Sequence, residues 1–220
     1  MESNEAIYRP SCIARLVEDK RRGSDSFKRM VLMVSARFGI ANLKVPADRE
    51  IIMEGSEQRL SFNVMPNKDV TETLFVHHYE VSPNFIRSVF DRSYSSEMRD
   101  SPDHYTFLSA LTQNQKMGYV YLCWRFGLPY DPHAEELMKI WPTKTDCRMS
   151  GLLSQSKNVH QDLHIQGMTF HGVKDGLGRL DVNSVTMTSR KEILLRTSAV
   201  VYLPEEQFLV CRASERETQG

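Results

Sequence analysis

The sequence predicts an α+β fold in which antiparallel sheet carries a central group of about three helices on one face. Residues 163–203 contain three runs in which apolar and polar side chains alternate, as in strands that bury one face. Asp175-Gly176 lies between the first two runs and favours the positive φ angles of a hairpin turn. Residues 83–141 instead repeat their apolar side chains at helical intervals. We therefore expect helices on a sheet that closes with a three-stranded meander.

The composition indicates a folded chain of ordinary character. It has 220 residues, of which 40% are hydrophobic and 25% charged, and its formal net charge is zero. This length is ample for one buried core, so we expect a flexible arm at 1–12, a single domain at 13–211 and a disordered tail at 212–220. No apolar run approaches the ~20 residues that span a bilayer, and the N-terminus does not resemble a signal peptide. These features predict an intracellular protein, cytoplasmic or nuclear, without a transmembrane segment.

Two short helices are predicted before residue 40. Ile13, Leu16 and Val17 share one helical face within 13–22. A second helix follows a break at Gly23, and the competing interpretation of its centre is a strand. Its apolar stripe consists of Phe27, Met30, Val31, Val34 and Phe38.

Residues 40–81 change to a period of two and predict three or four strands. Leu60, Phe62 and Val64 alternate with polar residues before a turn-rich segment at 66–69. The next run, through Val76, continues the same alternation. This segment is the β-rich half of the predicted domain.

Three helices are then expected in 83–141, each introduced by a capping side chain and a proline. Proline suits the first helical position because its missing N–H has no partner within the helix. In the second helix, the aromatic run 119–126 leaves helix and strand open as alternatives. Residues 143–161 are polar and are expected to form a loop. The three cap pairs are Ser82-Pro83, Ser101-Pro102 and Asp131-Pro132.

Three histidines are the candidates for metal binding or catalysis. His160 and His164 are four residues apart, and His171 follows seven later, so three converging imidazoles would suit zinc. The predicted strand instead places residues i and i+4 about 13 Å apart, at ~3.3 Å per residue. We therefore predict no metal site and no cofactor. The three histidines remain weak candidates for metal ligands. If the chain is a hydrolase of unrecognised class, they are also its candidate catalytic residues.

Basic clusters near the N-terminus are the candidate binding residues. Nucleic acid, an acidic partner or an anionic membrane surface could be contacted there, and a nuclear import signal has a similar composition. Acidic neighbours such as Glu18 and Asp25 weaken these interpretations and favour a solvated helix end. The clusters consist of Lys20, Arg21, Arg22, Lys28 and Arg29.

The motifs of common enzymes are missing from the sequence. Cys12, Cys123, Cys147 and Cys211 are widely spaced, which excludes paired zinc-type spacing, and there is no G-x-S-x-G elbow or phosphate-binding loop. The leading prediction is therefore a non-catalytic assembly protein that binds protein partners and itself, for which a small viral matrix-type protein is one example. The alternatives are an RNA-associated protein that uses the basic clusters, and a hydrolase.

Overall fold

The computed structural model describes residues 43–54, 58–65, 70–95, 105–130, 138–151, 153, 155–189 and 191–219. The chain divides into two compact units, Met1–Leu43 and Lys44–Gly220, and every element described here lies in the second. The arm and the two helices predicted before residue 40 lie outside the described residues. The single domain expected over 13–211 stays a prediction.

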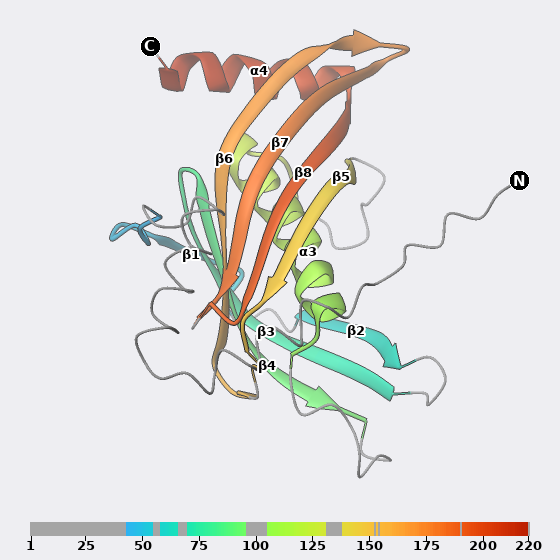
Figure 1. Ribbon diagram of the computed structural model, residues 1–220. Helices are drawn as coiled ribbons and strands as arrows, with labels where there is room; N and C mark the ends of the chain where they lie inside the picture. Colours follow the sequence, from blue (N-terminus) through green and yellow to red (C-terminus); the bar gives the residue numbers. More distant parts are fainter. Residues whose placement is uncertain are drawn as a thin grey trace, which may run out of the picture. The chain divides into compact units, whose positions relative to one another are not determined.

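One antiparallel sheet of eight strands dominates the second unit (Figure 1). Its order is β1-β3-β4-β6-β7-β8-β5, and β2 also pairs with β3. Among the described residues there are two helices, and neither combines the length and apolar character that a membrane crossing requires. The strands are β1 (Glu50–Ile52), β2 (Gln58–Met65), β3 (Val70–Ser82), β4 (Phe85–Tyr94), β5 (Lys139–Met149), β6 (Val159–Lys174), β7 (Leu177–Thr188) and β8 (Ile193–Pro204). The helices are α3 (Phe107–Phe126) and α4 (Glu205–Gln219).

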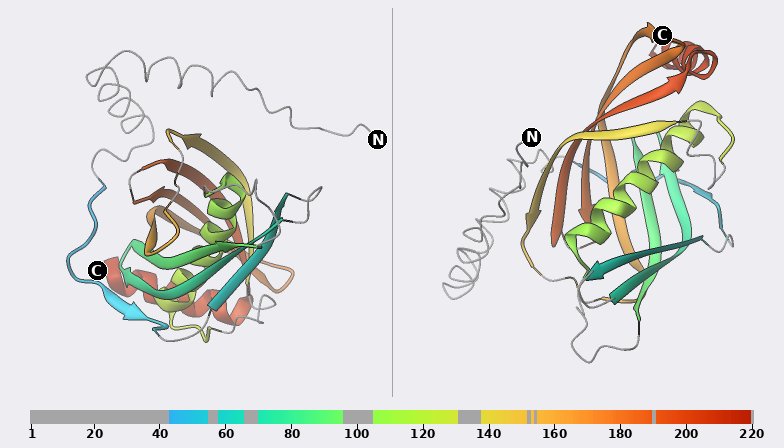
Figure 2. Two further views of the ribbon diagram at one scale, coloured as in Figure 1. Left: turned by 90° about the horizontal axis from the view of Figure 1, so that it is seen from below. Right: turned by 90° about the vertical axis from the view of Figure 1, so that its right-hand side faces the viewer.

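Helix α3 lies along one face of the sheet, and the strands curve around it (Figure 2). We call this the inner face. Its side chains form the main core together with those of α3, because alternate residues of every long strand point toward the helix. Members of this core that are at most 2% exposed include Leu74, Ile86, Met117, Leu163 and Leu180. The prediction of sheet with helix packed on one face is confirmed in this form, with α3 as the packed helix.

Both ends of α3 have standard caps. Thr106 precedes the helix in an extended conformation, and its side chain accepts a hydrogen bond from the Ser109 N–H at 3.1 Å. Gly127 ends the helix with φ of 62°, a left-handed conformation that glycine adopts without steric cost. The open alternative at 119–126 is thereby decided in favour of helix.

The first predicted helix after residue 82 is wrong, because this segment is strand β4. Pro83 and Asn84 are the two central residues of the β3–β4 hairpin, and Asn84 has φ of 66°. A type II turn combines proline at its first central position with a positive φ at the second. The same proline that suits a helix start therefore serves a turn here.

The third predicted helix and the predicted loop at 143–161 are also wrong where the structure describes them. Residues 139–149 form β5, which pairs with β8, and β6 begins at Val159. β5 is an edge strand whose outward side chains meet solvent, so its sequence is polar enough to resemble a loop. Pro142 lies at a bulge in this strand, where the missing N–H is tolerated.

The closing meander is confirmed, but the disordered tail is not. β6, β7 and β8 pair in sequence, and Asp175 and Gly176 have φ angles of 53° and 75° at the β6–β7 turn, as the Asp-Gly pair predicts. Residues 205–219 form α4 instead of a disordered tail. Phe208 and Cys211, one turn apart, are fully buried in the core and hold this helix on the fold.

Phe208 packs directly on Gly178 of β7. A Cβ atom at residue 178 would overlap the Phe208 ring, so the close approach of α4 requires glycine there.

We predict that Gly178→Ala lowers the free energy of unfolding by about 1–3 kcal/mol, because the added methyl group displaces Phe208. Urea unfolding measures the change. Gly167→Ala on β6 is the matched control, since nothing lies within 4 Å of its added Cβ. Equal unfolding midpoints for the two variants would contradict the close packing of α4.

Candidate functional site

A buried ion pair lies at the N-terminal end of α3. Arg92 of β4 donates from Nε to Glu72 Oε1 of β3 at 2.9 Å, and the two side chains are 1% and 0% exposed. Ser109, in the first turn of α3, donates its hydroxyl hydrogen to the other carboxylate oxygen of Glu72. Glu72 is thus held by a guanidinium on one side and by a hydroxyl on the other. Glu72, Arg92 and Ser109 are called the N-terminal cluster below.

Arg92 also ties a connecting segment to the sheet. Its Nη1 donates to the carbonyl oxygens of Leu153 and Gln155 at 2.9 and 2.8 Å, and its Nη2 donates to the Tyr94 hydroxyl at 2.8 Å. A buried guanidinium costs free energy unless its donors are paired, and these bonds supply the partners. Arg92 therefore fixes β3, β4 and the segment before β6 around one charge.

Two tyrosines beside the cluster stay protonated. Burial and the nearby Glu72 carboxylate raise the pKa of Tyr94 to about 12 and that of Tyr105 well above its usual range. Tyr105 is fully buried and donates its hydroxyl hydrogen to Gln161 Oε1 at 2.9 Å. Gln161 in turn donates to the Ala110 carbonyl of α3 at 3.0 Å.

Buried polar side chains continue from the cluster along the interface between α3 and the inner face. Gln113 of α3 donates to the Ser88 hydroxyl at 2.5 Å, and the Thr186 hydroxyl donates to Asn114 of α3. Strand register explains the continuity, because Tyr79, Ser88, Gln161 and Thr188 occupy paired positions across four strands. We call this set the polar seam. Its members, all less than 8% exposed, are Tyr79, Ser88, Gln113, Asn114, Gln161, Ser184, Thr186, Thr188 and Thr197.

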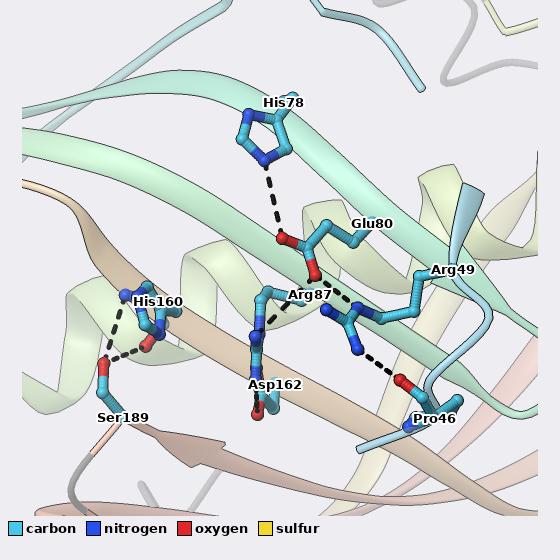
Figure 3. Close-up of polar contacts among 8 residues, drawn as sticks. All are labelled: Pro46, Arg49, His78, Glu80, Arg87, His160, Asp162 and Ser189. Carbon is cyan, nitrogen blue, oxygen red and sulfur yellow. Dashed lines mark hydrogen bonds and ion pairs between the residues drawn. The ribbon is translucent and has the colours of Figure 1, made fainter. Parts of the chain in front are cut away.

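The outer face of the sheet carries a different polar group, a ladder of charges that alternate in sign (Figure 3). Arg87 binds Asp162 through two hydrogen bonds of 2.7 and 2.9 Å, and Arg49 donates to Glu80 at 2.5 Å. Burial alone would raise the pKa of Glu80, but Arg49 and Arg87 together hold it below its usual value. His78 lies 3.7 Å from Glu80 at the edge of this ladder. Each charge has an opposite neighbour, which suits a role in fixing strand register.

The three candidate histidines do not converge. All lie on β6, where His160 is half-buried, His164 packs edge-on against Phe85 at 5.0 Å, and His171 pairs with Asp181 at 2.9 Å. Burial lowers the pKa of His164, so its imidazole is neutral near pH 7. Within the described residues, no three metal-binding side chains gather.

The basic clusters at Lys20, Arg21, Arg22, Lys28 and Arg29 lie outside the described residues, and their binding role stays a prediction. Burial raises the pKa of Cys123, Cys147 and Cys211 to about 11 each, so none of these thiols is activated as a nucleophile.

The N-terminal cluster has the chemistry of an activated hydroxyl. A carboxylate that accepts a hydrogen bond from a serine can take its proton when the serine attacks an acyl carbon. The first turn of α3 adds the positive end of the helix dipole, which favours negative charge. Sequence reasoning missed this cluster, although Glu72 and Arg92, each in phase with the buried apolar residues of its strand, were a readable signal.

The comparisons with known proteins concern the fold. The scan against family models finds no match, and neither does the search of curated proteins. Among solved structures, a mutant thioesterase from Pseudomonas aeruginosa is 8% identical over 60% of this chain and 81% of its own, with a TM-score of 0.35. A thioesterase from Haemophilus influenzae is 8% identical over 58% and 79%, with a TM-score of 0.32. A MaoC-like dehydratase from Rhodospirillum rubrum is 14% identical over 48% and 67%, with a TM-score of 0.29.

These findings correct two predictions. The described part of the chain is an antiparallel sheet with two helices, and not a sheet with three helices. The prediction of a non-catalytic assembly protein, which acts by self-association or as a viral matrix-type protein, is wrong. The three solved structures reported above are named as two thioesterases and a dehydratase.

We predict that Glu72→Gln lowers the free energy of unfolding by about 3–5 kcal/mol, because it leaves the Arg92 charge buried and unpaired. Glu80→Gln, in the more exposed outer ladder, is the matched control and should cost at most about 1 kcal/mol. Urea denaturation, monitored by circular dichroism, measures the loss in free energy of unfolding for each variant. A Glu72 variant as stable as the Glu80 variant would show that the buried pair does not hold the fold.

Proposed function

We propose that this chain is a hydrolase that cleaves acyl esters or thioesters at the N-terminal cluster, with Ser109 as nucleophile and Glu72 as general base. The observation that carries the proposal is the hydrogen bond from the Ser109 hydroxyl to the Glu72 carboxylate in the first turn of α3. This pair brings together a nucleophile, a base and the positive end of a helix dipole.

The reaction proceeds in two balanced steps. In the first, Ser109 Oγ attacks the acyl carbon, its proton passes to Glu72, and the negative oxygen that forms is favoured by the N-terminus of α3. The alcohol or thiol leaves with that proton, and the acyl group stays bonded to Ser109. In the second, water attacks the acyl group with the help of Glu72, which releases the carboxylic acid and restores the serine.

Arg92 is a positioning residue in this scheme. It fixes the Glu72 carboxylate from the side opposite to Ser109 and holds the segment at Leu153 beside it. The cluster is closed to solvent, since Glu72 and Ser109 are 0% exposed. Substrate entry therefore requires the first turn of α3 to separate from β3 and β4. We expect slow turnover, limited by this opening.

The names of the structures with a similar fold guide the choice of the first substrates. Acyl thioesters are the bonds that a thioesterase cleaves, so they belong in the assay beside simple p-nitrophenyl esters. A series of acyl chain lengths defines the preferred substrate.

We predict that Ser109→Ala reduces kcat/KM for the best substrate to the level of the uncatalysed reaction, because no nucleophile is left beside Glu72. Release of thiol or p-nitrophenol measures the rate. Thr112→Ala is the matched control, since Thr112 lies on the same helix and donates its hydroxyl hydrogen only to the Leu108 carbonyl at 3.0 Å. Its activity should equal that of the unmodified protein. Equal activity of the Ser109 variant would exclude Ser109 as the nucleophile.

A further inference from the structure

The polar seam contains two buried atoms without a partner. Among the described residues, no group lies within hydrogen-bond distance of Gln113 Oε1 or Thr197 Oγ1. Gln113 is 0% exposed and Thr197 is 4% exposed. A buried polar atom without a hydrogen bond costs about 1–3 kcal/mol, so native proteins leave few of them.

The surroundings of the two atoms are polar. Gln113 contacts Ser88, and it lies beside Asn114, which accepts from Thr186. Thr197 of β8 is paired in register with Ser184 of β7, and both strands present these residues to α3.

Two residues of β7 connect the surroundings of Gln113 with those of Thr197. Thr186 lies two residues from Ser184 on β7, and both side chains point to the inner face. On the edge strand β5, Thr145 is paired in register with Thr197 and is only partly buried. A continuous series of hydroxyl and carboxamide side chains therefore extends from the β5 edge of the sheet to the centre of α3.

We propose that the polar seam binds internal water molecules, which donate hydrogen bonds to Gln113 Oε1 and exchange hydrogen bonds with Thr197 Oγ1. Water is the ligand that suits both atoms, because the carboxamide oxygen needs a donor and a hydroxyl can serve as donor or acceptor. Internal waters in proteins typically make two to four hydrogen bonds to groups that are otherwise unsatisfied. An apolar ligand would leave both atoms unpaired, and a charged one would meet no opposite charge among the seam residues.

A role for this water in the hydrolysis of an acyl-Ser109 bond rests on the proposed function. Gln113 follows Ser109 by four residues, so both side chains lie on the same face of α3. Water held at Gln113 is therefore available on the helix face where an acyl-Ser109 bond would have to be hydrolysed, without entry of a new molecule from solvent.

Thr197→Val and Gln113→Leu test the site, because each removes the polar atom with little change in side-chain volume. Magnetic relaxation dispersion of water nuclei counts long-lived internal water molecules. Each variant should lose about one of them. Thr169→Val, at an exposed position of β6, is the matched control and should keep the full count. Thr197→Ser, which keeps the hydroxyl, should keep it as well.

The direction of the stability change gives an independent readout. Loss of a bound water lowers the urea midpoint of Thr197→Val, whereas removal of a dry, unpaired hydroxyl raises it; Gln113→Leu is left out of this comparison because it also removes the hydrogen bond to Ser88. An unchanged count of long-lived waters, or a raised midpoint, would overturn the proposal. Absence of esterase and thioesterase activity would overturn only the proposed function, since neither of these measurements depends on turnover.

Discussion

Helix α3 is enclosed by a single sheet, and every polar side chain that it buries must find its partner on that sheet. Eleven of its residues are buried, and Ser109, Gln113 and Asn114 are among them. A polar group in an apolar interior costs several kcal/mol unless it is hydrogen-bonded. The sheet therefore presents Glu72, Ser88 and Thr186 at matching positions. These contacts allow one position of the helix, whereas apolar packing alone tolerates small shifts in register.

The strongest of these contacts is at the start of the helix. The Glu72–Arg92 pair is fully desolvated. The attraction between two buried charges offsets their desolvation cost only when additional hydrogen bonds satisfy their remaining donors and acceptors. Here the Arg92 guanidinium joins two strands and a connecting segment, and the Glu72 carboxylate accepts a hydrogen bond from Ser109 in the first turn of α3. The same arrangement that fixes the helix also places a hydroxyl, a carboxylate and a helix N-terminus together. Stability and the proposed chemistry thus depend on one group of residues.

The sequence predicted the parts of the fold that local patterns determine. The meander at 163–203 followed from alternation and from the Asp175-Gly176 turn, and α3 followed from helical spacing. The errors arose where one local signal serves two structures. Pro83 suits a helix start and a type II turn equally, and only the pairing of β3 with β4 decides between them.

The grouping of the three cluster residues could not be predicted, because they are separated by up to 37 residues and meet only through strand pairing and helix packing. The helical spacing of apolar residues in 83–141 predicts that they face the core, yet Leu108 of α3 is 44% exposed while Gln113 is fully buried. A helix that is enclosed on several sides does not show a simple apolar stripe. Polar residues at core-facing positions, such as Arg92 on β4, are the signal that points to the site.

In the proposed reaction, Ser109 of the N-terminal cluster carries the acyl group. Intact mass spectrometry after incubation with an acyl thioester, followed by peptide mapping, tests this claim most directly. We expect one added acyl group on the peptide that contains Ser109, and no addition in Glu72→Gln protein that folds. An acyl group on another residue, or none during demonstrated turnover, would contradict it.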